Sequence, residues 1–136
     1  IENLIRTKGA IYAGIATLLD SVKMTINDVK QVFVAGGFGH YLELDKAIII
    51  GLLPEIPCEK VKFIGNASLL GARLVMLSKE MEEIAEKIAE KLTYLELSVH
   101  SGFMDKFISA LFLPHTNVEE FPSVMAQLKQ LRNAKK

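Results

Sequence analysis

Three closely spaced glycines are the residues of this chain best suited to contact a ligand. Gly36, Gly37 and Gly39 directly follow the apolar run VFVA at residues 32–35. Glycine lets the backbone pass close to a ligand and accepts positive φ angles that most residues avoid. In open α/β sheets ligands lie beyond the carboxyl ends of strands. The segment therefore predicts a buried strand that opens into a glycine turn for a ligand, with a nucleotide as the favoured ligand. A tight turn with no ligand is the alternative.

Two common nucleotide motifs do not explain this turn. The run GGFG lacks the GxGxxG spacing of a dinucleotide-binding fingerprint, and no GK[ST] triplet follows it, as a P-loop would require. The sequence therefore excludes both of these site classes.

A second glycine turn begins the run GNASLLGA at residues 65–72. Gly65 and Asn66 interrupt the pattern after a predicted strand at residues 61–64. Gly71 and Ala72 fall one to two helical turns later, where small side chains permit a close helix crossing. A plain packing seam between helices is the alternative interpretation of Gly71.

The cysteine and the histidines predict no chemistry of their own. Cys58 has no second cysteine to pair with, and no two histidines have the four-residue spacing of a helical zinc site. His40 follows the glycine turn without a nearby carboxylate or cysteine partner. The sequence therefore predicts no catalytic residue and no metal site.

The elements that must position these turns follow from hydrophobic periodicity. Helices are expected at residues 2–22, 45–52, 67–77, 79–92, 103–112 and 122–132, and strands at residues 32–35, 61–64 and 94–99. Pro54 and Pro57 are expected to end the second helix. Strands that alternate with helices predict an α/β fold with a small mixed sheet of about three strands. Small residues on the first helix predict close packing against a strand or a ligand.

Length, charge and cysteine count restrict the class of protein. The 136 residues suit one globular domain, and 16 basic residues balance 16 acidic ones, so no net charge favours nucleic acid or a membrane surface. One cysteine fits a reducing cytoplasm, and no 18-residue apolar run indicates a membrane span. Because the sequence starts inside a helical pattern, we expect a fragment of a longer protein.

The ordered motifs resemble the last segment of the superfamily that contains actin, sugar kinases and heat-shock chaperone ATPases. These motifs are TKGAI at residues 7–11, VFVAGGFG at residues 32–39 and GNASLLGA at residues 65–72. The resemblance implies a ribonuclease H-like, actin-type ATPase subdomain. It also implies that the first glycine turn is the adenosine motif and that the helix with Gly71 and Ala72 connects two lobes.

A closer resemblance covers nearly the whole chain. The runs TKGAIYAGI, AIIIGLLP, YLELS and FISALFLPH are similar to the carboxyl-terminal part of reductive activators of corrinoid proteins. This resemblance implies ATP or ADP with Mg as cofactor, a corrinoid protein as partner, and reduction of its cobalt from Co(II) to Co(I). The metal site and an iron–sulfur domain would lie upstream, so the fragment alone would not be catalytic.

The resemblance also implies roles for particular residues. Gly36, Gly37 and Phe38, together with Gly39, would contact the adenosine side of the nucleotide. Lys8 would reach the adenine or ribose, with an ordinary solvated lysine as the alternative. Gly65 and Asn66 would border the pocket, and Gly71 and Ala72 would serve lobe closure.

Two other functions stay open at this point. An actin-like small-molecule kinase or a dehydratase activator would keep the fold and change the reaction. A non-catalytic module would use its exposed apolar faces to form a homodimer or to dock a partner, and its glycine turn would be only a turn.

Overall fold

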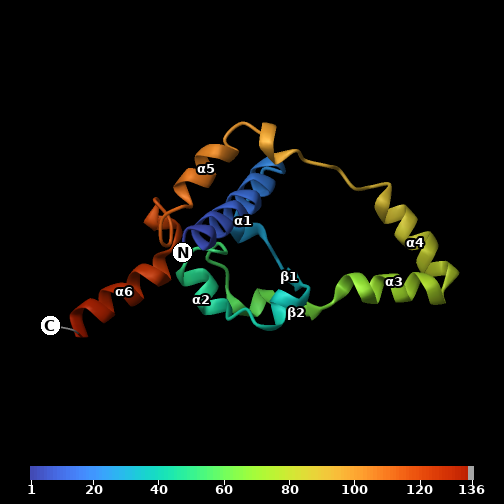
Figure 1. Ribbon diagram of the computed structural model, residues 1–136, viewed down its shortest axis with the longest axis horizontal. Helices are drawn as coiled ribbons and strands as arrows, with labels where there is room; N and C mark the ends of the chain where they lie inside the picture. Colours follow the sequence, from blue (N-terminus) through green and yellow to red (C-terminus); the bar gives the residue numbers. More distant parts are fainter. Residues whose placement is uncertain (135–136) are drawn as a thin grey trace.

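The computed structural model describes residues 1–134, apart from the side chains of Phe38, His40, Ser98 and Ala134. Its helices and strands follow one another as α1 (Glu2–Ser21), β1 (Val32–Ala35), α2 (Leu44–Ile49), β2 (Val61–Gly65), α3 (Ala67–Leu77), α4 (Lys79–Ala89), α5 (Phe103–Ser109) and α6 (Pro122–Ala134). Figure 1 shows α1, α2 and α5 gathered on one side, with the α3–α4 hairpin on the other and the two strands between them. The α/β class expected from the sequence is confirmed.

Helix α1 packs against α5, and small residues make this contact possible. A Cβ atom placed on Gly9 would lie 3.2 Å from Leu111 and 3.3 Å from Phe107. Ala13 and Gly14 on the same helix are also buried. The predicted close approach of the first helix is confirmed, but its neighbour is a helix and not a strand.

One hydrophobic core joins α1, α2 and the chain from the end of α5 to the start of α6. Its buried members are Tyr12, Ile48, Ala110, Phe121 and Val124. We call α1, α2, α5 and the first turns of α6 the body of the molecule. Helices α1, α2 and α6 each bury residues in this core, whereas α5 ends beside the core at Ala110 and packs against α1.

The sheet contains two parallel strands among the described residues, β1 and β2. Val32 pairs with Val61, and the register shifts between Val34 and Ala35. The third strand expected at residues 94–99 is wrong, because this segment holds only a short 3-10 turn at Leu97–Val99. A strand needs a neighbour for its backbone hydrogen bonds, and this segment instead runs from α4 back to α5 (Figure 1).

Helix α2 ends earlier than the prolines predicted. Its last residue is Ile49, and Gly51 then takes a φ angle of 72° while its amide donates to the carbonyl of Ile48. A glycine at positive φ is a common helix stop. Gly51 therefore ends the helix before Pro54 and Pro57 can.

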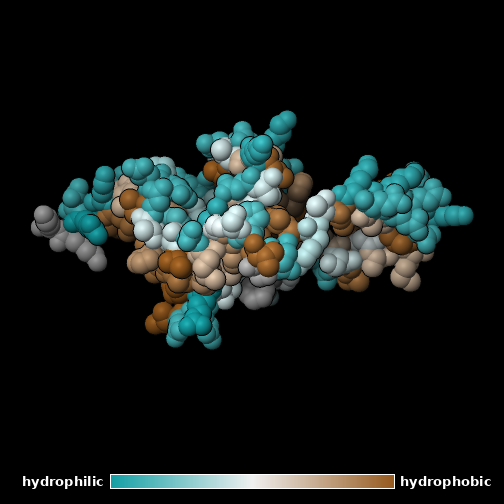
Figure 2. Space-filling model, turned by 90° about the horizontal axis from the view of Figure 1, so that it is seen from above, coloured by the Kyte–Doolittle hydropathy of each residue, from teal (hydrophilic) through white to brown (hydrophobic). Residues whose placement is uncertain are grey.

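Helices α3 and α4 form an arm that lies outside the core. Ser78 ends α3, and its hydroxyl oxygen accepts a hydrogen bond from the Met81 amide at the start of α4. Neither helix has a buried residue. In the view of Figure 2, the arm at the right carries hydrophilic side chains along its upper side and hydrophobic ones below. Across residues 1–134, every helix is too short or too polar to span a bilayer.

Candidate functional site

The two strands end side by side in glycines with positive φ angles. Gly36 has a φ of 94° and Gly65 a φ of 64°. The amide of Gly36 donates a 2.7 Å hydrogen bond to the carbonyl of Gly65. Since few other residues adopt these angles without strain, glycine is required at both positions. The structure therefore brings the two predicted glycine turns together at one edge of the sheet.

The space beside these glycines is open. A Cβ atom added to Gly36, Gly37 or Gly65 would meet no other atom within 4 Å. Packing within the described chain therefore does not explain why these positions lack side chains. An open edge beyond the carboxyl ends of parallel strands is where α/β folds bind ligands.

Gly39 has a different function from its neighbours. It is buried, and a Cβ atom on it would lie 3.1 Å from Val34 and 3.4 Å from Phe63. Its amide also closes the turn by donating to the carbonyl of Gly36 at 3.2 Å. Gly39 therefore lets the turn pack closely against the two strands. The side chain of Phe38, which was predicted to contact adenosine, lies outside the described part of the chain.

Asn66 couples the second glycine turn to helix α3. Its side-chain oxygen accepts a 3.0 Å hydrogen bond from the amide of Leu69, which makes Asn66 the cap of the helix. This cap fixes where α3 starts relative to Gly65. Asn66 thus lies next to Gly65 at the open edge, with its side chain engaged by the helix. Its place beside a nucleotide pocket stays a prediction.

Gly71 and Ala72 lie on an exposed stretch of α3. A Cβ atom on Gly71 would meet nothing within 4 Å, so the packing seam offered as an alternative for this residue does not occur between the described helices. The small surface is free for an element outside the described residues. The proposed part in lobe closure stays a prediction.

Lys8 does not lie beside the glycine turns. Its side chain is 1% exposed, and its ammonium donates to the carbonyl oxygens of Phe112 and Pro114, the latter at 2.6 Å. Burial lowers the pKa of Lys8 to about 8. The alternative of a solvated lysine is wrong. In this structure Lys8 holds the 112–114 turn against α1, and its contact with a nucleotide stays a prediction.

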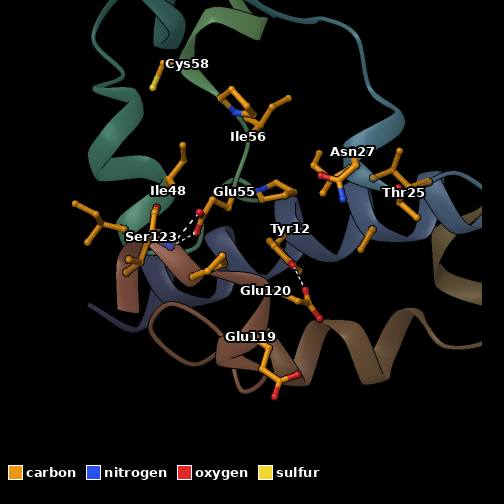
Figure 3. Close-up of a pocket in the computed structure, with 18 of the residues that line it drawn as sticks. Tyr12, Thr25, Asn27, Ile48, Glu55, Ile56, Cys58, Glu119, Glu120 and Ser123 are labelled. Atoms are coloured by element: carbon orange, nitrogen blue, oxygen red, sulfur yellow. Dashed lines mark hydrogen bonds between the residues drawn. The ribbon is translucent and has the colours of Figure 1, made fainter. Parts of the chain in front are cut away.

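A groove of about 940 Å³ opens in the body, away from the glycine turns. Figure 3 shows Tyr12 and Glu120 meeting across it, and Glu55 reaching Ser123. The Tyr12 hydroxyl donates to the Glu120 carboxylate, and burial together with this acceptor raises the pKa of Tyr12. Both Glu55 oxygens accept from the Ser123 amide at 3.1 Å. Local sequence does not predict this groove, because its walls come from segments far apart in the chain.

Cys58 forms a hydrogen bond with a neighbouring side chain, and His115 packs against an aromatic ring. The Cys58 thiol donates to an Asp45 oxygen at 3.3 Å, and this hydrogen bond raises the pKa of the exposed thiol. The ring of His115 packs 4.9 Å from that of Tyr12. Within the described residues, no three His, Cys, Asp or Glu side chains gather as a metal site would require.

Comparisons with known proteins all lead to one family. The family model described as the C-terminal domain of RACo, the ASKHA domain, matches residues 1–125. The chain is 36% identical over 101 residues to the corrinoid activation enzyme RamQ of Eubacterium limosum, covering 74% of this chain and 17% of the relative. It is 27% identical over 113 residues to the Co(II) methylated amine-specific corrinoid protein reductase of Methanosarcina barkeri, covering 82% and 21%.

A solved structure supports the same assignment. The structure of a reductive activator for a corrinoid, iron-sulfur protein superposes with a TM-score of 0.84 at 50% sequence identity, covering 90% of this chain and 19% of that one. The chain therefore spans about a fifth of the length of the relatives it matches. Both the predicted fold class and the predicted family are confirmed. This chain belongs to the family of the C-terminal ASKHA domain of RACo.

Proposed function

We propose that this chain forms the adenosine-binding wall of the ATP cleft in a longer reductive activator of a corrinoid protein. The observation that carries the proposal is the pair of strand-end glycines at Gly36 and Gly65, hydrogen bonded to each other and open on their outer side. The relatives bear the names of corrinoid activation and reduction enzymes, which supports the corrinoid partner.

The described residues suit the adenosine side of a nucleotide. Because no side chain projects from Gly36, Gly37 or Gly65, a flat base or a ribose can approach the backbone. The strands and the Asn66 cap hold this backbone in a fixed position before any ligand arrives. In the proposal, the chain contributes binding and orientation.

The rest of the cleft belongs to other parts of the longer protein in this proposal. They would supply the magnesium site, the phosphate loops and the iron–sulfur cluster. ATP, when bound, would supply the free energy for returning the corrinoid cobalt from Co(II) to Co(I). Residues 1–136 would then be a carboxyl-terminal subdomain that is not catalytic alone. A cytoplasmic location and a homodimer stay predictions.

The other candidate functions have less support. The kinase and the dehydratase activator keep the fold, but the relatives reported above are named for corrinoid activation. A non-catalytic docking module agrees with the exposed arm but gives no reason for Gly37, where neither a positive φ angle nor packing requires a glycine.

Substitution of Gly37 tests the proposed nucleotide wall. Gly37 does not have the positive φ of Gly36, and the space beside it is open, so Gly37→Val is expected to change stability by less than about 0.5 kcal/mol. If adenosine lies beside Gly37, the valine side chain occupies the space that adenosine needs. Isothermal titration calorimetry of the full-length protein should then show ATP affinity reduced at least about tenfold, or about 1.4 kcal/mol.

Ala89→Val at the end of α4 is the matched control, because it adds similar bulk at an exposed site far from the sheet edge. Its ATP affinity should equal that of the wild type. Unchanged affinity in folded Gly37→Val would remove this turn from the nucleotide site. A full-length wild-type protein that binds neither ATP nor ADP would favour the docking module.

A further inference from the structure

The groove in the body has an apolar floor and a carboxylate rim. Its walls come from α1, α2, residues 54–58 and the start of α6. Apolar side chains include Leu19, Met24, Ile26, Ile48, Ile49 and Ile56. A partner with both apolar and charged groups would therefore match this surface.

The rim carries an uncompensated negative charge. Five lining residues are acidic, namely Asp20, Asp45, Glu55, Glu119 and Glu120, and the single basic one is Lys106. Lys106 pairs with Asp20 at 2.6 Å, which leaves a formal surplus of four negative charges (five minus one). Neutral groups donate hydrogen bonds to the carboxylates of Glu55 and Glu120, namely the Ser123 amide and the Tyr12 hydroxyl. Neutral donors orient carboxylates without cancelling their charge, so the rim favours a cationic occupant.

The chain itself contains a segment that has both apolar and cationic side chains. Helix α6 starts in the groove wall and then extends away from the body (Figure 1). Its outer half carries Leu128, 36% exposed, and Leu131, 61% exposed, together with Lys129 and Arg132. No acidic residue occurs from residue 122 to the end of the sequence. Neither cation forms a salt bridge with a described residue.

Helical spacing places these leucines on the face that lines the groove. Leu128 lies four residues after Val124, and Leu131 four residues after Gln127; both earlier residues line the groove. Residues four apart share one face of a helix. The match to the family model ends at residue 125, before this outer half.

We propose that two copies of the protein pair through antiparallel α6 helices, each outer half lying in the other copy's groove. A helix of 13 residues is about 20 Å long, so a twofold axis near its middle sets the first half of one helix beside the second half of the other. Such an interface is self-complementary. Leu128 and Leu131 cover the apolar floor, and Lys129 and Arg132 meet the carboxylate rim. This pairing is independent of the proposed nucleotide site.

A charge swap tests the pairing. Glu119 and Arg132 are exposed, so Glu119→Lys and Arg132→Glu should leave the fold intact, which circular dichroism can verify. In sedimentation equilibrium of the full-length protein, each single substitution should weaken dimerisation at least about tenfold. The double variant, which restores opposite charges, should recover dimerisation to within about threefold of the wild type. The wild-type dimer should also weaken as salt increases.

Glu82→Lys on the exposed side of α4 is the control for a change in overall charge, and it should dimerise like the wild type. A wild-type protein that is monomeric at all concentrations overturns the proposal. A dimer that neither single substitution weakens overturns it as well, because another surface then holds the copies together. Failure of the double variant to recover also contradicts the α6 pairing.

Discussion

The body and the arm of this molecule differ sharply in how their apolar residues are covered. The body buries Tyr12, Ile48, Phe121 and Val124 in one core. The arm has no buried residue, although α3 exposes Leu69, Leu70, Leu74 and Leu77 and α4 exposes Ile84 and Ile88. Between them, the sheet leaves Phe33 and Phe63 half exposed.

Apolar residues therefore have two different functions within this one chain. Packing in the body stabilises the scaffold, because its apolar faces meet one another. The open faces of the sheet and arm stabilise nothing until something covers them. The glycine turns lie at this open part, which agrees with a cleft whose opposite wall comes from elsewhere. Substitutions in the body should therefore cost stability, whereas those in the open part should cost binding.

Truncation of a core side chain should give the largest effect on the body. Phe121 is 0% exposed, and Phe121→Ala is expected to lower the free energy of unfolding by about 4 kcal/mol, because it leaves a cavity. Leu77→Ala in the arm removes a side chain that is 73% exposed and should cost less than about 0.5 kcal/mol. Urea unfolding measures both. Similar losses for the two variants would contradict the division into body and arm.

Two positive-φ glycines provide the next comparison. A Cβ atom on Gly51 would lie 2.1 Å from the Pro114 carbonyl oxygen, so Gly51→Ala should cost about 3 kcal/mol or more from the clash and the strain together. Gly65 has a similar φ but open surroundings, and Gly65→Ala should cost only the strain, about 1–2 kcal/mol. Thermal unfolding of the two variants checks the order. If Gly65→Ala proved the more damaging, the sheet edge would not be open.

The pH dependence of stability should reveal buried Lys8. Its pKa is about 8 when folded and 10.5 when exposed, so between these values the unfolded state binds more protons and stability rises with pH. The raised pKa of Tyr12 acts in the opposite direction, and only above its ordinary value of 10.0. From pH 7 to pH 10 the wild type should gain about 2 kcal/mol relative to Lys8→Met. Parallel profiles for the two proteins would show that this ammonium is not buried.

Local sequence was sufficient to predict the glycine turns and most helices. Residues 32–35 and 61–64 are short apolar runs that end at glycine, and both form strands within a residue of the prediction. The positive φ angles of Gly36 and Gly65 follow from the same local pattern. These features depend on neighbours in the chain, which periodicity and turn chemistry describe well.

Contacts between distant segments could not be predicted in this way. Lys8 has the sequence context of a surface lysine, yet its partners are carbonyls more than 100 residues away. Glu55 meets the Ser123 amide across 68 residues, and no motif connects them. The prediction of a third strand was wrong for the same reason. Strand formation depends on a neighbouring strand that the local pattern does not identify.

Hydrogen exchange on the full-length protein, with and without ATP, measures the proposed nucleotide wall directly. ATP should slow exchange of the amides at residues 36–39 and 65–70, since these surround the open sheet edge. Amides of α1 within the body should exchange at unchanged rates, because their hydrogen bonds and packing are already complete. Bound ATP that leaves exchange unaltered at both glycine turns would contradict the account.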